Sequence, residues 1–149
     1  MTRRSGDRIP GRRAYGGVLV IPCRLNEDYR YWLLVDTGAA ITMLSRRVAE
    51  EMGLDWENPL WQKRVASVHQ VVWAPVVRLV SLQVGSQRLS DVEVLVVPLP
   101  AELRVDGVLG VNFLERFRPT FEFEQAVLVL RGYRPQARPV GDPYPPGQD

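Results

Sequence analysis

The sequence is poor in the residues that stabilise a fold through covalent or metal cross-links. Its 149 residues include one cysteine, Cys23, and one histidine, His69. A single cysteine excludes an intrachain disulfide framework, and one cysteine with one histidine excludes a zinc site rich in these residues. No apolar run approaches the roughly 20 residues that a membrane-spanning helix needs. We therefore expect one domain with no metal or cofactor and no membrane insertion.

Positive charge is concentrated near the N-terminus, although the formal net charge is only +2. Residues 1–14 hold five arginines and one aspartate, so the rest of the chain is mildly acidic. Such a segment is typical either of an electrostatic arm for nucleic acid or anionic lipid, or of a solvated tail. No aromatic residue is interleaved with these arginines, which favours the solvated tail. We expect residues 1–14 to be a basic disordered tail, and we expect no nucleic-acid partner.

The N-terminal region also lacks the pattern of a secretory signal. Its apolar stretch at residues 16–22 is too short, and no small-residue cleavage site follows it. A lone Cys23 fits a reducing compartment. These features predict a cytoplasmic protein.

The first half of the chain predicts two strands, a loop and a short helix. The strands are expected at residues 17–25 and 29–35, which are rich in aliphatic and aromatic residues and flank a polar turn. A loop of small residues follows at 36–40 and leads into another short strand. Ser45 is a good N-cap and Gly53 a good residue to end a helix, so a short amphipathic helix is expected between them.

The second half repeats this order of strand, loop and short helix after a longer β region. Residues 132–149 contain five prolines, which predict a disordered C-terminal tail. The sequence therefore predicts one mainly β domain over residues 15–131 with two short helices. The expected elements of the second half are a β region at 65–83 broken near 67–70, a strand at 89–97, a loop at 106–110, a helix at 112–117 and a closing hairpin over 120–131.

Asp36 ends an apolar strand and opens a loop of small residues, so its carboxylate is expected at the protein interior. A lone buried carboxylate is costly unless it is paired or hydrogen-bonded. Thr37 places a hydroxyl beside the acid, and Gly38 permits close approach of another chain or a ligand. Taken alone, Asp-Thr-Gly is more often a polar turn than a catalytic loop.

In its context this loop resembles the active-site strand and loop of retropepsins, the retroviral-type aspartic proteases. The resemblance rests on the run Leu-Leu-Val-Asp-Thr-Gly-Ala-Ala-Ile-Thr at residues 33–42. Gly-Val-Leu-Gly at residues 107–110, followed by Asn-Phe-Leu, resembles the second signature of that family. Residues 121–123 and 127–130 resemble the last strands of bacterial members. Two signatures in the expected order are more specific than either alone.

The resemblance implies a small closed β-barrel of the retropepsin type, with two short helices, that contributes half of an active site. Only Asp36 follows the motif, whereas Asp106 lacks a following Thr-Gly and is interpreted as part of a turn. The second carboxylate would then come from a second copy, which implies a homodimer that hydrolyses peptide bonds. The residues that the resemblance assigns to the site are the catalytic Asp36, the supporting Thr37, Gly38 and Ala39, and the second loop with Val108, Leu109 and Gly110.

Two places depart from the family's pattern. The flap that covers the substrate commonly has glycine at its tip, whereas the flap candidates here are Val68, His69, Gln70 and Val71. Ala40 stands where viral enzymes carry a second aspartate that binds substrate. These departures keep an alternative open, which is a retropepsin-like binding or dimerisation module with little or no peptidase activity.

The remaining reactive side chains have simpler interpretations. Cys23 lies in an apolar strand, which favours a core thiol, and His69 is interpreted as an exposed loop residue. Nothing local supports a Cys23–His69 nucleophilic pair. The tryptophans favour packing over a stacking platform for nucleic acid.

Overall fold

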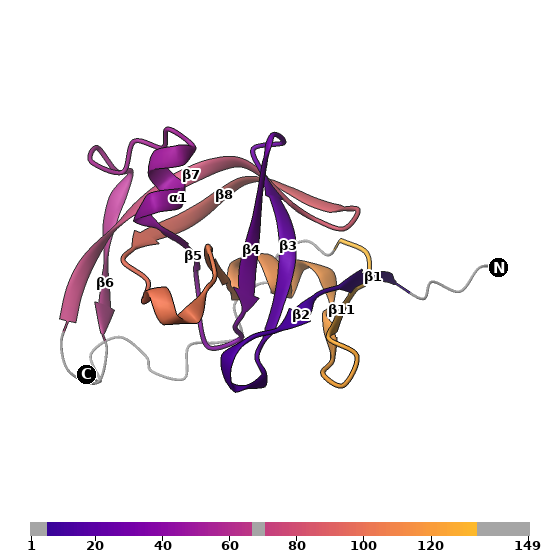
Figure 1. The fold of residues 1–149 in the computed structure, drawn as a ribbon. Helices are drawn as coiled ribbons and strands as arrows, with labels where there is room; N and C mark the ends of the chain where they lie inside the picture. Colours follow the sequence, from indigo (N-terminus) through magenta and orange to yellow (C-terminus); the bar gives the residue numbers. More distant parts are fainter. Residues whose placement is uncertain (1–5, 67–70, 134–149) are drawn as a thin grey trace, which may run out of the picture.

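The computed structural model describes residues 6–66 and 71–133, which form strands and a few short helices (Figure 1). A mainly β chain with two short α-helices is confirmed. The strands are β1 (Asp7–Pro10), β2 (Arg12–Arg13), β3 (Leu19–Leu25), β4 (Tyr29–Val35), β5 (Thr42–Ser45), β6 (Trp61–Ala66), β7 (Val71–Val84), β8 (Gln87–Val97), β9 (Gly107–Leu109), β10 (Thr120–Glu122) and β11 (Val127–Leu130). The helices are α1 (Arg46–Glu51) and α2 (Val111–Leu114), with short 3-10 helices η1 (Tyr15–Gly17), η2 (Ala101–Leu103) and η3 (Glu115–Phe117).

The larger sheet closes on itself to form the expected barrel. Its strands are hydrogen-bonded in the order β2-β3-β4-β9-β5-β8-β7-β6, and a further pairing of β3 with β7, the second strand from each end, closes a ring. The closed ring therefore consists of β3, β4, β9, β5, β8 and β7, with β2 and β6 attached outside it. A second sheet of order β1-β11-β10 lies beside the barrel (Figure 1).

The core is filled by aliphatic side chains that alternate strand positions direct inward. Leu25, Leu33 and Leu44 are completely buried, and they share one cluster with Leu128 of the second sheet. At the α1 end, Ser45 caps the helix by accepting a hydrogen bond from Val48 N–H at 3.2 Å, as expected. The two sheets and the helices α1 and α2 therefore share the main hydrophobic core, and Ala74, Val76 and Leu95 form a second, smaller cluster.

Residues 7–13 correct the expectation of a disordered N-terminal tail. Strand β1 pairs antiparallel with β11, and β2 pairs antiparallel with β3. Ile9 is only 4% exposed and belongs to the main core, while Arg8 donates two hydrogen bonds to the Glu122 carboxylate, at 2.9 and 2.8 Å. The many charged residues of this segment are typical of a tail, so the sequence did not predict the strands. Pairing with neighbouring strands and the single inward-facing side chain of Ile9 hold the segment in place.

Residues 107–109 correct a second expectation, because they form strand β9 rather than a loop. Strand β9 pairs parallel with β4 and antiparallel with β5. A Cβ at Gly107 would lie 2.3 Å from the carbonyl oxygen of Met43, so only glycine allows the two backbones to approach this closely.

Some expected features fall outside the described residues. The expected tails include residues 1–5 and 134–149, and the expected flap tip includes residues 67–70. The strands that lead to this tip, β6 and β7, form an antiparallel hairpin. Within 6–66 and 71–133, no helix has both the length and the apolar character needed to span a membrane.

Candidate active site

The Asp36 loop begins where β4 ends. The Asp36 backbone N–H donates to the carbonyl oxygen of Leu109 at 3.1 Å, which continues the pairing of β4 with β9. Its side-chain Oδ1 accepts a hydrogen bond from Gly38 N–H at 2.8 Å, and Ala39 N–H closes the turn on the Asp36 carbonyl oxygen at 3.2 Å. This turn holds the carboxylate in one orientation.

The loop lies at the surface of the single chain, which corrects the expectation of an interior carboxylate. Asp36 is half-buried, Thr37 and Gly38 are exposed, and Ala39 is 6% exposed. The chain leaves the barrel at the end of β4, so the residues after Val35 project beyond the core. Asp36 and Thr37 are therefore accessible to another molecule.

The two glycine-containing signatures meet directly behind Asp36. Val111 N–H donates to the Ala39 carbonyl oxygen at 2.8 Å, and Asn112 N–H donates to the Ala40 carbonyl oxygen at 3.1 Å. Gly110 is buried, and a Cβ there would lie 2.7 Å from the Ala39 oxygen. The absence of a side chain at this position lets the second segment support the Asp36 loop. Its two neighbours on β9, Val108 and Leu109, are buried in the sheet.

A buried polar network that the sequence pattern did not predict joins these two segments. The Thr42 side chain is fully buried, and its hydroxyl donates to Asn112 Oδ1 at 2.8 Å and accepts from Gly110 N–H at 3.0 Å. Asn112 Oδ1 also accepts from Thr42 N–H at 2.9 Å, and Asn112 Nδ2 donates to the Glu93 carbonyl oxygen at 2.9 Å. The one sequence feature that could have indicated this network is Asn112, a polar residue in an otherwise apolar helical segment.

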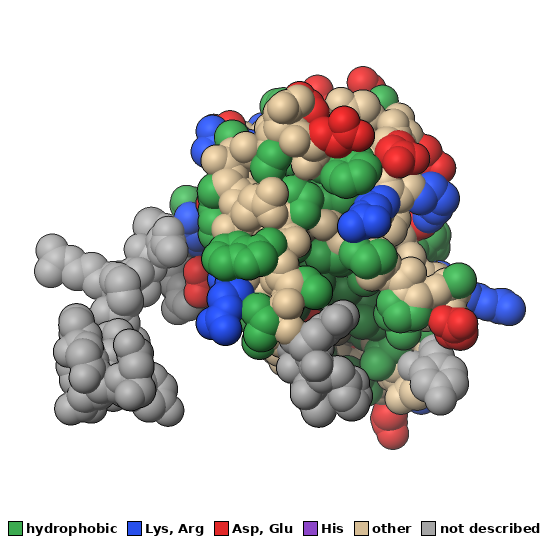
Figure 2. Space-filling model, turned by 90° about the vertical axis from the view of Figure 1, so that its left-hand side faces the viewer, with side chains coloured by type: hydrophobic (Ala, Val, Ile, Leu, Met, Phe, Trp, Pro, Cys, Tyr) green, Lys and Arg blue, Asp and Glu red, His purple; other side chains and the backbone are tan. Residues whose placement is uncertain are grey.

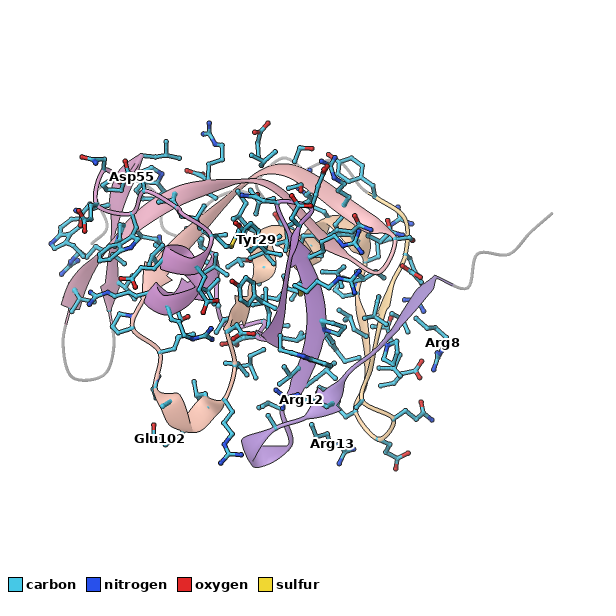
Figure 3. All side chains as sticks on the ribbon, turned by 45° about the horizontal axis from the view of Figure 1, so that its top comes forward. Arg8, Arg12, Arg13, Tyr29, Asp55 and Glu102 are labelled. Atoms are coloured by element: carbon cyan, nitrogen blue, oxygen red, sulfur yellow. The ribbon has the colours of Figure 1, made fainter. Side chains whose placement is uncertain are left out.

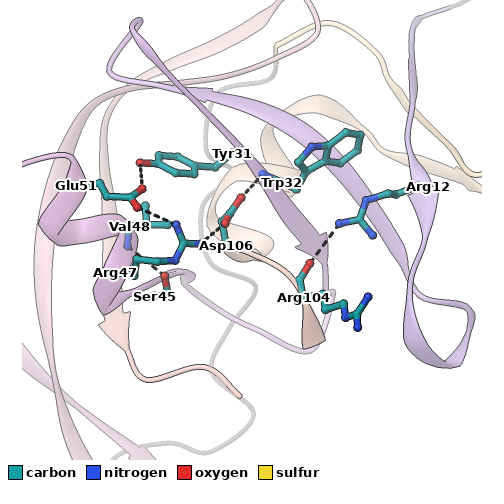
Figure 4. Close-up of polar contacts among 9 residues, drawn as sticks. All are labelled: Arg12, Tyr31, Trp32, Ser45, Arg47, Val48, Glu51, Arg104 and Asp106. Atoms are coloured by element: carbon teal, nitrogen blue, oxygen red, sulfur yellow. Dashed lines mark hydrogen bonds and ion pairs between the residues drawn. The ribbon is translucent and has the colours of Figure 1, made fainter. Parts of the chain in front are cut away.

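Asp106 takes part in a separate network at the other end of β9 (Figure 4). Its Oδ2 accepts from the Trp32 backbone N–H at 2.8 Å, and its Oδ1 is paired with the Arg47 guanidinium. Arg47 also pairs with Glu51 at 3.0 Å, and Glu51 accepts from the Tyr31 hydroxyl at 2.8 Å. These bonds tie α1 to β4 and β9, so the Asp106 carboxylate stabilises the fold.

The hydrogen bond to Asp106, followed by that to Glu51, raises the pKa of Arg47, and the same network shifts the pKa values of Glu51 and Tyr31. The hydrogen bond from Tyr31, followed by that from Arg47, lowers the pKa of Glu51. Desolvation, followed by the hydrogen bond to Glu51, raises the pKa of Tyr31 to about 12. These shifts favour the form of each group that makes the hydrogen bond.

A small hollow of about 170 Å³ adjoins the Asp36 loop. Two aromatic side chains, Phe121 and Phe123, form part of its wall. Their rings stack with centroids 6.0 Å apart. The larger hollow of about 660 Å³, between β8 and the α2–η3 segment, does not include this loop. The residues around the small hollow are Leu19, Val35, Asp36, Thr37, Phe121 and Phe123.

The other candidate residues are placed as follows. Of the flap candidates, Val68, His69 and Gln70 lie outside the described residues, and Val71 begins β7 with 45% exposure. Cys23 is buried, and burial raises the pKa of its thiol, which confirms a core thiol. In the described ranges no three of His, Cys, Asp and Glu come close enough together to hold a metal ion.

A family model for aspartyl proteases matches residues 21–113, well over half of the chain and both signature segments. The chain belongs to the aspartyl protease family. A search of curated proteins finds no match.

Two solved structures show that the fold is that of retropepsin-like members of this family. A retropepsin-like aspartic protease from Rickettsia conorii is 24% identical, with a TM-score of 0.65 over 87% of this chain and 96% of that chain. The retroviral protease-like domain of Ddi1 from Leishmania major is 18% identical, with a TM-score of 0.54 over 76% of this chain and 87% of that chain. This member of the aspartyl protease family therefore has the single-domain, retropepsin-like fold that the resemblance implied.

Proposed function

We propose that this aspartyl protease is a homodimeric endopeptidase whose active site uses two Asp36 carboxylates, one from each chain. The observation that supports it most is the contrast between Asp36 and Asp106. Asp36 borders an open hollow, whereas Asp106 is paired with Arg47 and bonded to Trp32. Asp106 is bonded to Trp32, which precedes Asp36 by four residues. At the rise per residue of a strand, Asp106 therefore lies roughly 13 Å from Asp36. A carboxylate dyad requires about 3 Å, so a second copy must supply the partner.

The proposed chemistry follows from placing two carboxylates together. Two like charges at this distance cannot both ionise easily, so the pair shares one proton. The ionised carboxylate takes a proton from a water held between them, and the protonated one polarises the peptide carbonyl. The water oxygen attacks the carbonyl carbon without a covalent enzyme intermediate, and the C–N bond then breaks as the leaving nitrogen takes a proton from the dyad. Gly38, which is exposed and lacks a side chain, lets the substrate backbone approach Asp36.

A peptide substrate is supported by the apolar face around the β6–β7 hairpin. Figure 2 views the molecule from the side of β6, and hydrophobic side chains gather there around a hollowed area. Trp73 is 65% exposed and shares one face of the hairpin with Val71, whereas Trp61, which is 42% exposed, and Val72 lie on the other face. An exposed apolar surface of this kind suits the hydrophobic side chains of a polypeptide.

The test compares Asp36→Asn with Asp28→Asn, which removes a carboxylate from an exposed turn. We expect hydrolysis of unfolded protein substrates to be abolished in Asp36→Asn and retained in Asp28→Asn, with both variants folded. Asparagine cannot share the proton, so neither half of the dyad functions. Hydrolysis that survives in Asp36→Asn would contradict the proposal.

The alternative, a binding or dimerisation module, predicts a different pair of results. In that case a folded dimer would show no hydrolysis, and a pepstatin-type inhibitor would not raise its melting temperature at acidic pH. The endopeptidase predicts hydrolysis and a rise in melting temperature, because a ligand that binds only the folded state stabilises it.

A further inference from the structure

The N-terminal strand β2 holds one carbonyl group of the β10–β11 turn. Arg13 donates to the Phe123 carbonyl oxygen from Nε at 2.9 Å and also from Nη2. Ala126 N–H donates to the same oxygen at 3.2 Å. Arg13 is exposed at the outer end of the sheet (Figure 3). Its hydrogen bonds to a residue 110 positions later in the sequence fix the backbone of Phe123.

The group that Arg13 holds is part of the wall beside Asp36. Phe123 borders the small hollow, is 57% exposed and stacks on Phe121. Leu19, which also borders the hollow, is the strand partner of Arg13 in the β2–β3 pairing. Arg13 therefore contacts two segments that border the hollow next to Asp36.

The second sheet leaves one edge open on the same side. Strand β10 pairs with β11 alone among the described strands, while β1 covers the other edge of β11. Strand β1 therefore occupies one edge of this sheet within its own chain, and β10 forms the edge that stays open. An open strand edge next to an exposed aromatic side chain is a template for pairing with another chain.

We propose that Arg13 is a positioning residue of the assembled site: from within its own chain it fixes Phe123 and the open edge of β10, which the second copy must cover. This rests on the proposed function, because only a second copy brings the second Asp36 to the hollow. Both chains of a symmetric dimer contribute the contact, so each substitution acts twice at the interface.

The experiment compares Arg13→Ala with Arg12→Ala, a neighbour on the same strand. Arg12 is a close match because its Nη2 also donates to a backbone carbonyl, that of Arg104 at 3.2 Å, which does not border the hollow (Figure 4). The dimer dissociation constant is measured by sedimentation, and peptide hydrolysis is measured over the same concentrations. We expect Arg13→Ala to raise the dissociation constant about ten-fold, or about 1.4 kcal/mol. Arg12→Ala should leave it unchanged.

Further results of the same measurements decide between the possibilities. Hydrolysis by Arg13→Ala should recover at high protein concentration with an unchanged KM, and Arg13→Lys should restore part of the dimer affinity, because lysine donates to the carbonyl without the fork. Equal dissociation constants for wild type and Arg13→Ala, or equal losses in both alanine variants, would overturn the role of Arg13. A dimer that responds as expected but does not hydrolyse peptides would contradict the proposed function alone. A chain that stays monomeric would overturn both.

Discussion

Gly110→Ala is the substitution that tests most directly how the second segment supports the Asp36 loop. The added Cβ would lie 2.7 Å from the Ala39 oxygen, 2.8 Å from the Ile41 carbonyl carbon and 2.9 Å from Thr42 N. All three are backbone atoms, of the loop after Asp36 and of the first residue of β5, so the clash cannot be relieved by turning a side chain. Relief requires moving this loop and weakening the hydrogen bond from Val111 to Ala39.

We expect a loss of about 3 to 4 kcal/mol of unfolding free energy, from overpacking and one or two weakened hydrogen bonds. For a chain of this size that corresponds to a fall of about 10 °C in melting temperature. Gly132→Ala is the matched control, because a Cβ there meets no atom within 4 Å. The assay is urea and thermal unfolding, with peptide hydrolysis measured below the transition. If Gly110→Ala unfolds at the same urea concentration as Gly132→Ala, the close approach of the two segments is not as the structure shows.

Three other predictions concern pH and reactivity. Hydrolysis should have an acidic, bell-shaped pH profile, because the site needs one proton shared by two Asp36 carboxylates; a rate that rises steadily to alkaline pH would point to another nucleophile. The hydrogen bond from Arg8 lowers the pKa of Glu122, so its contribution to stability is present above about pH 4.3 and is lost as the pH falls through the folded-state pKa. Acid unfolding of the wild type should therefore be steeper than that of Glu122→Gln, and equal slopes would show that this ion pair does not contribute. Cys23 should react with a thiol reagent only after unfolding, and Cys23→Ala should retain hydrolysis; rapid labelling of the folded protein would contradict its burial.

The sequence predicts those parts of the site that depend on neighbouring residues in the chain. An apolar strand followed by Asp36 and small residues predicts a loop that presents a carboxylate, and Ser45 predicts the start of α1. Both are found, although Asp36 lies nearer the surface than expected. The glycines at 107 and 110 identified the second segment, but not its pairing as β9 with β4, because parallel pairing joins strands far apart in sequence.

The parts that the sequence did not predict are contacts between distant residues. Thr42 and Asn112 are 70 residues apart, and Arg13 and Phe123 are 110 apart. The sequence around an arginine in a charged N-terminal segment is the same whether its side chain is solvated or donates to a distant carbonyl group. The strand pairings of β1 and β2 and the position of Ile9 in the core distinguish this segment from a tail.

If each active site takes one Asp36 from each of two chains, subunit mixing must lower hydrolysis by a fixed factor. Wild type and Asp36→Asn are combined in equal amounts, well above the dimer dissociation constant, and allowed to exchange. If both carboxylates are required and pairing is random, only about a quarter of the dimers are fully wild type. Hydrolysis should therefore fall to about a quarter of that of an equal total concentration of wild type. A fall to only one half would show that each chain carries a complete site, which would contradict the account.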